Sequence, residues 1–204
     1  MNPSAEDKIK AAALQVFLQK GYANCTSREI AREAGMNVAL VNYYFRSKSK
    51  LFAIVFESVM NDFMHSMVQV FSSDLPIRSK IELLIAREYE FLALHPEIPN
   101  FVLSEIERNP NSMDEIKPML SVILKSGVLE EVELLQKKGE MRSIDMVSIT
   151  LLLMSNCQFP FMAKKLVHAI HGIELAAYEN QLQNHREHVV QMILNYLFPN
   201  EAHG

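Results

Sequence analysis

The stretch that constrains this chain most runs from Thr26 to Leu51 and reads TSREIAREAGMNVALVNYYFRSKSKL. Thr26 and Glu29 have the spacing of a capping box, the reciprocal hydrogen-bond pair that starts many helices. Gly35 stands where a helix end favours a left-handed residue, and Asn37 is a favourable N-cap for a second helix. Because the second helix would begin only two residues after the first ends, this spacing predicts a helix-turn-helix.

The second helix of this motif, residues 38–44, is expected to leave an unusual surface in solvent. Val41 and Phe45 fall on one face and should be buried, whereas the other face is small at its start and then hydrogen-bonding and aromatic. Such a face suits the DNA major groove, where small residues allow close approach and Asn can pair with adenine. The alternative is a helical hairpin inside a core, with Tyr43 and Tyr44 packed internally.

Together with the helix before it, this stretch resembles the DNA-binding domain of the TetR family of transcriptional regulators. The resemblance implies a recognition helix over residues 38–44 and a phosphate contact from Lys48. Asn42 stands where many family members carry tyrosine, so the base preference of the family does not carry over to this chain. The residues that carry the resemblance are Phe17, Gly21, Tyr22, Thr26, Ile30, Ala31, Ala34, Gly35, Tyr44, Phe45, Lys48 and Leu51.

The partner expected for this motif is double-stranded DNA. Phosphate contacts are predicted for residues that flank the second helix, namely Thr26, Arg28, Tyr44 and Lys48. Base contacts are predicted for Asn37, Val38, Ala39, Asn42 and Tyr43.

The distribution of charge supports this partner, although the whole chain has a net charge of −4. Residues 1–50 hold eight Lys or Arg and four Asp or Glu, a net charge of +4, so the remainder carries −8. A basic head on an acidic body suits a protein that presents one end to phosphates. The acidic run formed by Glu130, Glu131 and Glu133 is expected to be a solvated helix face.

Helical periodicity recurs throughout the chain, and no strand pattern is found. The sequence predicts an all-α fold of about nine helices, with a helix-turn-helix domain over residues 1–50 and a larger helical domain for effector binding and dimerisation over 51–204. Pro160 is expected to kink the helix predicted at 144–168, which is apolar almost all round. The other predicted helices beyond the motif cover residues 5–20, 47–71, 77–94, 100–108, 113–138 and 173–197.

The predicted body has two expected roles. A helix-turn-helix that reads a palindrome needs two copies, so we expect a homodimer formed by the last two helices, unless these helices only close the core of one chain. The residues predicted for the dimer interface are Leu152, Val189, Ile193, Tyr196 and Leu197.

Methionine and phenylalanine side chains in the body suit an adaptable apolar pocket for an unknown small-molecule effector, although the same pattern also occurs in ordinary cores. The residues predicted to line that pocket are Met60, Met64, Met67, Phe71, Phe91, Phe101, Met119, Ile123, Phe159 and Met162.

Other classes of function find less support in the sequence. No catalytic set, phosphate-binding loop or complete metal-ligand cluster is visible, so neither an enzyme nor a cofactor is expected. Two cysteines give no disulfide framework, and neither a signal-peptide pattern nor an apolar run of the roughly 18 residues of a membrane span occurs. We therefore expect a cytoplasmic regulator, most simply a repressor, without a membrane partner.

Two alternatives from other classes remain open at this point. One is an all-α small-molecule carrier or enzyme that does not bind DNA, which a turnover assay would reveal. The other is a head that binds a partner protein, in which case binding should lack the steep salt dependence of DNA binding.

Overall fold

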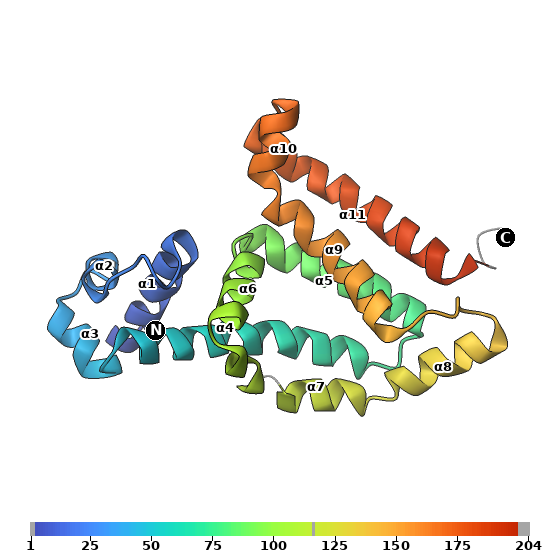
Figure 1. Ribbon diagram of the computed structural model, residues 1–204, viewed down its shortest axis with the longest axis horizontal. Helices are drawn as coiled ribbons and strands as arrows, with labels where there is room; N and C mark the ends of the chain where they lie inside the picture. Colours follow the sequence, from blue (N-terminus) through green and yellow to red (C-terminus); the bar gives the residue numbers. More distant parts are fainter. Residues whose placement is uncertain (1–2, 116, 200–204) are drawn as a thin grey trace. The chain divides into compact units, whose positions relative to one another are not determined.

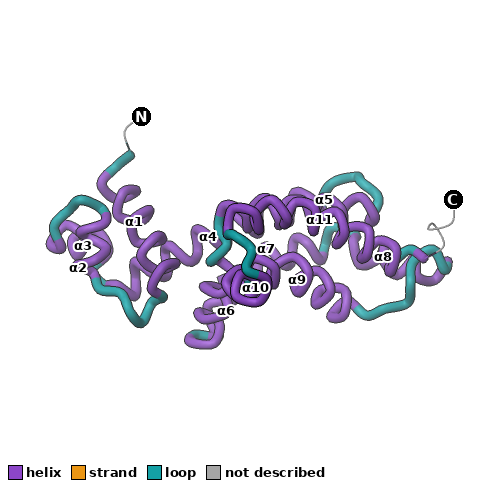
Figure 2. Tube along the Cα trace, turned by 90° about the horizontal axis from the view of Figure 1, so that it is seen from above, coloured by secondary structure: helices purple, strands orange, loops and turns teal. Residues whose placement is uncertain are grey.

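The computed structural model describes residues 3–115 and 117–199 (Figure 1). Within these residues all regular structure is helical and no strand occurs (Figure 2), which confirms the all-α prediction. The helices are α1 Ala5–Lys20, α2 Ser27–Glu33, α3 Val38–Phe45, α4 Lys48–Phe71, α5 Ile77–Leu94, α6 Ile98–Arg108, the 3-10 helix η1 Pro110–Glu115, α7 Lys117–Leu124, α8 Val128–Lys138, α9 Met146–Met162, α10 Lys164–His171 and α11 Leu175–Leu197.

The chain divides into two compact units. The first comprises Met1–Asp62 and Asn100–Ile116, and the second comprises Phe63–Pro99 and Lys117–Gly204. Helix α4 begins in the first unit, and its residues from Phe63 onward belong to the second. The functional boundary predicted after residue 50 lies inside the first unit, which also takes in most of α6.

The core of the first unit is built from the apolar faces of its short helices. Phe17 of α1, Ile30 of α2, and Val41 and Phe45 of α3 are buried, together with Leu51 near the start of α4. Each of these five side chains lies on the apolar stripe of its own helix, and a stripe of this kind marks core positions in the sequence itself.

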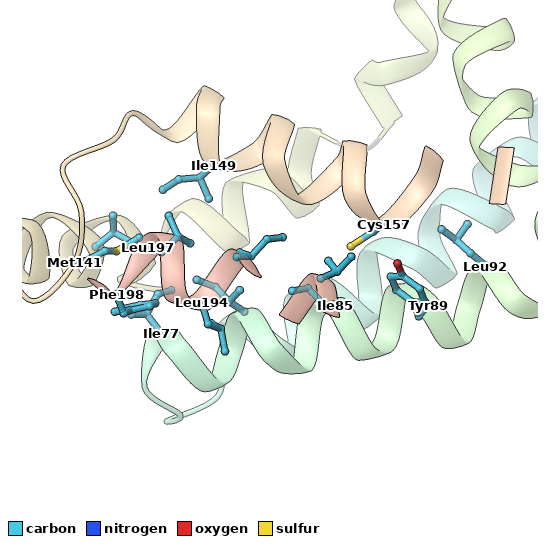
Figure 3. Packing of buried hydrophobic residues seen from close by; sticks show 14 of the residues in the cluster. Ile77, Ile85, Tyr89, Leu92, Met141, Ile149, Cys157, Leu194, Leu197 and Phe198 are labelled. Atoms are coloured by element: carbon cyan, nitrogen blue, oxygen red, sulfur yellow. The ribbon is translucent and has the colours of Figure 1, made fainter. Parts of the chain in front are cut away.

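The core of the second unit lies between α5, α9 and α11. Figure 3 shows Ile77, Ile85 and Tyr89 of α5 facing side chains of α9 and α11, among them Cys157 and Leu194. Helix α5 presents one continuous buried face, as expected from its 3.6-residue periodicity. Helix α9 is apolar almost all round, yet only one side of it is buried and the other side is exposed.

Two long helices predicted from the sequence are interrupted in the structure. The helix predicted at 113–138 is divided among η1, α7 and α8, and Gly127 has a left-handed backbone (φ 81°) immediately before α8. A left-handed residue cannot continue a right-handed helix, and glycine adopts this conformation without a steric penalty. The helix predicted at 144–168 is divided into α9 and α10, which are bent by 64° where they meet.

The bend between α9 and α10 lies just after Pro160 rather than at it. Proline has no N–H, so the carbonyl of Asn156 loses its usual helical donor, and the hydroxyl of Tyr89 in α5 donates to it instead at 3.1 Å. The carbonyl of Pro160 accepts a hydrogen bond of 2.6 Å from the hydroxyl of Tyr178 in α11. Helix α9 therefore continues through Pro160 to Met162, because side chains of two neighbouring helices satisfy its carbonyls.

Replacing Tyr89 with phenylalanine should lower the free energy of unfolding by about 1–3 kcal/mol, the usual cost of leaving a buried acceptor without its donor. Burial raises the pKa of Tyr89, so its hydroxyl remains a donor across the accessible pH range. Urea unfolding followed by circular dichroism measures the loss. The control is Tyr43→Phe, which removes the hydroxyl of a side chain that is 77% exposed and should change the stability by less than about 0.5 kcal/mol. Equal effects of the two substitutions would contradict this account of the bend.

Across the described residues no single helix is both long and apolar enough to cross a membrane. Only α9 and α10 taken together reach the necessary length and hydropathy, and they do so as the bent pair described above.

Candidate nucleic-acid interface

The predicted capping box is present at the start of α2. The side chain of Thr26 accepts a hydrogen bond from the backbone N–H of Glu29, and Glu29 Oε2 accepts from the backbone N–H of Thr26 at 2.8 Å. Lys20 Nζ of α1 lies 2.6 Å from the other oxygen of Glu29. The hydrogen bonds from Lys20 and then from Thr26 lower the pKa of Glu29 to about 2, so this carboxylate is ionised at neutral pH.

The turn between α2 and α3 follows the signals present in the sequence. Gly35 has a positive φ of 66°, and the N–H of Met36 closes the end of α2 by donating to Ala31 O at 2.8 Å. Asn37 caps α3, since its Oδ1 accepts from the N–H of Leu40 at 2.8 Å. Buried Val41 then fixes which side of α3 faces the core. The helix-turn-helix is therefore held by local hydrogen bonds at both helix ends.

The outer face of α3 is the surface predicted to read bases. Asn37, Ala39 and Asn42 are exposed, and Val38 is half-buried. The side chain of Tyr43 is 77% exposed, and that of Tyr44 is 41% exposed. The alternative in which both tyrosines pack inside a core is therefore wrong, and this face carries the sequence of small, amide and aromatic groups that a major groove can accept.

Arg46 ends α3 in a strained conformation. It has a φ of 61°, and it is the one residue other than glycine with a positive φ in the part of the chain that the structure describes. For an L-amino acid this region costs roughly 1–2 kcal/mol, and such strain is concentrated at functional sites. The strained backbone turns the chain from α3 into α4 within two residues and leaves the Arg46 side chain exposed.

The four predicted phosphate contacts are placed differently from one another. Arg28 and Tyr44 are exposed, and the hydroxyl of Thr26 donates to Glu29 Oε2 at 2.9 Å within the capping box. Lys48 Nζ donates to two backbone carbonyls of the loop between α1 and α2, those of Tyr22 (2.8 Å) and Cys25 (2.9 Å). Lys48 therefore anchors this loop with two of its three N–H groups, and its contact with a phosphate stays a prediction.

The ten residues predicted to line an effector pocket do not share one environment. Phe101 and Met60 belong to the first unit. In the second unit, Met67 packs with Val70 and Leu84 against the partly buried Phe71 and Ile123. Met64 is buried, Phe91 and Met162 are half-buried, and the side chain of Met119 lies outside the described residues.

Phe159 is separate from the other predicted pocket residues. It is 57% exposed and lines a groove of about 450 Å³ formed by α9, α10 and α11, which none of the other nine lines. The polar residues of this groove are Gln181, Asn184, His185 and His188. Among the described side chains, the residues predicted to line one effector pocket therefore do not come together: some belong to the first unit, others to the second, and Phe159 lines a surface groove.

The residues predicted for the dimer interface also divide. Val189, Ile193 and Leu197 are buried in the core of their own chain, where they follow one face of α11 at intervals of four residues. Leu152 is half-buried, and Tyr196 is exposed with the guanidinium of Arg142 4.4 Å from its ring centre. Both faces of this helix segment are apolar, so the sequence could not tell which face turns inward. Among the described side chains, the large apolar residues of α9 and α11 that are exposed are Met146, Val147, Leu151, Met154, Phe159, Met192 and Tyr196.

The capped α2 and α3, with a buried inner face and an exposed α3, define a helix-turn-helix DNA-binding module. Residues 9–55 match the family model of bacterial regulatory proteins of the tetR family, and residues 78–193 match the tetracyclin repressor-like C-terminal domain. The second match alone spans more than half of the chain, so this protein belongs to the TetR family and is a DNA-binding transcriptional regulator.

Comparison with individual proteins agrees with this assignment. The chain is 26% identical over 175 residues to the probable HTH-type transcriptional regulator YttP of Bacillus subtilis, a match that covers 82% of each chain. A TetR-family transcription regulator from Marinobacter aquaeolei has a TM-score of 0.71 at 13% identity, with 95% of each chain covered.

A third similar structure is the regulator FadR of Bacillus subtilis in complex with stearoyl-CoA. Its TM-score is 0.59 at 19% identity, and the match covers 93% of this chain and 97% of FadR. At this level of identity the two structures share the fold.

Proposed function

We propose that this regulator is a homodimeric repressor that binds a two-fold symmetric operator through α3 and is released by a small-molecule effector. The observation that carries the proposal is the exposed outer face of α3, which presents Ala39, Asn42 and Tyr43 to solvent. One short helix can read only a few base pairs, so a second copy related by a two-fold axis is needed for a specific site.

The exposed apolar residues of α9 and α11 support a second copy of this chain as the partner. Val147, Leu151 and Met154 recur along α9 at helical spacing, and Met192 and Tyr196 do so along α11. Large apolar side chains left exposed along two helices that contact each other are typical of an interaction site, and an isologous dimer needs one patch that can pair with its own copy.

The effector is proposed to be an apolar or amphipathic small molecule bound in the second unit. The support is the set of apolar side chains there that are only partly buried, including Phe71, Phe91 and Ile123. The FadR structure, which binds stearoyl-CoA, has the same fold. Because α4 extends from Lys48 beside α3 to Phe71, a ligand that displaces the far end of α4 would also act on the helix that follows the DNA-binding motif.

Selection of bound sequences from random duplex DNA tests this function. The full-length protein should enrich a two-fold symmetric site, and its affinity should fall log-linearly with salt because several phosphates are neutralised. Asn42→Ala should relax the preference at fixed positions of the site, at a cost of about 1–3 kcal/mol per bidentate base contact.

The matched control for this experiment is Arg28→Ala. It should weaken all sequences alike and reduce the salt slope by about one, as expected for a phosphate contact. If the folded protein enriched no sequence, the proposal that α3 recognises a specific operator would be overturned, and the small-molecule carrier would be favoured instead. An enriched site without two-fold symmetry would overturn the homodimer.

A further inference from the structure

Two cations from distant parts of the chain contact the same aromatic ring in the first unit. The ring of Tyr22, in the loop between α1 and α2, has Lys48 Nζ 4.2 Å from its centre. The guanidinium carbon of Arg108, the last residue of α6, lies 4.3 Å from the same centre. Both distances are within the roughly 6 Å range of a favourable cation–π interaction.

The guanidinium of Arg108 is held in place on its other side. Arg108 Nε and Nη2 donate to the two oxygens of Glu105, each at 2.7 Å, which is a bidentate pair. The side chain of Glu105 is only 4% exposed. A buried carboxylate of this kind requires a fixed partner, so the orientation of Arg108 is set by α6 and not by solvent.

Helix α6 is itself packed against α4 within this unit. The ring of Phe101 lies 5.3 Å from that of Phe52 and 5.7 Å from that of Phe56, measured between ring centres. Phe52 in turn meets the Tyr22 ring edge-on at 4.8 Å and lies 5.2 Å from the Arg108 guanidinium. An aromatic cluster therefore connects α6 with the loop that precedes α2.

We propose that Arg108 is a positioning residue for DNA binding. It holds the ring of Tyr22, while Lys48 holds the carbonyls of Tyr22 and Cys25, so both ends of this loop are fixed by cations. The loop runs directly into Thr26, the cap of α2, and α2 packs against α3. Through these contacts a residue at the end of α6 controls the placement of a motif far upstream of it in the chain.

The proposal rests on DNA binding by α3 and is independent of the effector and of dimerisation. Its rival is a direct contact between Arg108 and a phosphate, because the Arg108 side chain is 41% exposed. The salt dependence of binding separates the two roles. A phosphate contact contributes to the slope of log K against log salt, and a positioning residue does not.

The test compares Arg108→Gln, Arg108→Lys and the control Lys10→Gln in the full-length protein. The control removes one positive charge from α1, where Lys10 pairs with Glu6 on the surface. Arg108→Gln should weaken binding to a duplex selected by the parent protein about threefold to tenfold, with the salt slope unchanged. The affinity of Arg108→Lys should lie between that of the parent protein and that of Arg108→Gln, since lysine keeps the charge but cannot form the bidentate pair.

Hydrogen exchange of the free protein provides a readout that needs no DNA. In Arg108→Gln the amides of residues 22–25 should exchange faster than in the parent, whereas Lys10→Gln should leave them unchanged. This measurement also keeps the inference testable if the selection experiment yields no operator. Unchanged exchange at residues 22–25 would overturn the proposal, as would a salt slope reduced by about one or an unchanged affinity.

A second pair of variants removes any dependence on the folding of Arg108→Gln. Tyr22→Phe keeps the ring and should behave as the parent, whereas Tyr22→Leu removes the surface that both cations contact and should weaken binding at least as much as Arg108→Gln. Adding Arg108→Gln to Tyr22→Leu should change the affinity by less than about twofold if Arg108 acts through this ring. If the two substitutions reduced the affinity additively, Arg108 would not act through the Tyr22 ring, and the proposal would be contradicted.

Discussion

Glu131→Ala should lower the free energy of unfolding of the second unit by about 3 kcal/mol, because it leaves a buried charge without its partner. Glu131 Oε2 lies 3.3 Å from Lys80 Nζ, and Lys80 is only 5% exposed. The other oxygen of Glu131 accepts from the N–H of Ile77 at 2.7 Å. Ile77 is the first residue of α5, which has no side-chain cap of its own because Pro76 precedes it, so the same carboxylate also caps α5.

Urea unfolding measures this effect, and Glu133→Ala is the matched control. Glu133 is on the same helix and pairs with Lys137, but the two side chains are 68% and 74% exposed. An exposed pair of this kind contributes little, so the control should lose less than about 0.5 kcal/mol. A double variant, Lys80→Met with Glu131→Ala, should recover part of the loss because no charge then remains buried. Equal losses from Glu131→Ala and Glu133→Ala would exclude this explanation.

Lys48→Met should have the largest effect on DNA binding of any single substitution outside α3. It removes the donors of the Tyr22 and Cys25 carbonyls, and hydrogen bonds from a charged donor are each worth about 1.5–3 kcal/mol. Because Lys48 is only half-buried, we expect about 2 kcal/mol less stability in total and a loss of affinity greater than about tenfold for every sequence.

The control for Lys48 is Lys50→Met, which removes an exposed charge of the same helix turn. Affinity is measured by fluorescence anisotropy over a range of salt concentrations, and stability by thermal unfolding. Lys50→Met should leave the unfolding temperature unchanged. If Lys48→Met weakened DNA binding only as much as Lys50→Met and left the stability intact, the loop anchor would have no role in binding.

The helix-turn-helix could be predicted in detail because the sequence signals for its helix ends are local. Thr26 and Glu29 are three residues apart, and Asn37 and Leu40 are likewise neighbours, so the capping bonds follow from the sequence order alone. The partners of Lys48 lie 23 and 26 residues upstream. No sequence pattern marks those carbonyls, so a residue expected only to bind phosphate also proved to anchor a loop.

The body was less predictable because its pattern allows more than one arrangement. In α11 the residues at 189, 193 and 197 and those at 192 and 196 form neighbouring apolar stripes. Only the packing of α5 and α9 decides which stripe is buried. The sequence predicts Glu131 on a solvated face with Glu130 and Glu133, but its carboxylate accepts hydrogen bonds from the Ile77 N–H and from Lys80 Nζ. Those partners are about 50 residues away in the chain, so the run of charges could not reveal them.

The bend between α9 and α10 has a consequence for the order of folding. The carbonyls of Asn156 and Pro160 take their donors from Tyr89 of α5 and Tyr178 of α11. An isolated segment spanning α9 and α10 would have only water to bond these carbonyls, so it cannot acquire its native angle by local interactions. Helix α5, whose Tyr89 lies about 70 residues upstream of Asn156, and helix α11 downstream must both be in place before these hydrogen bonds can stabilise the bend. Contacts of such long range form late because the loops between them must close first. The angle between α9 and α10 is therefore expected to form only when α5 and α11 have packed against α9.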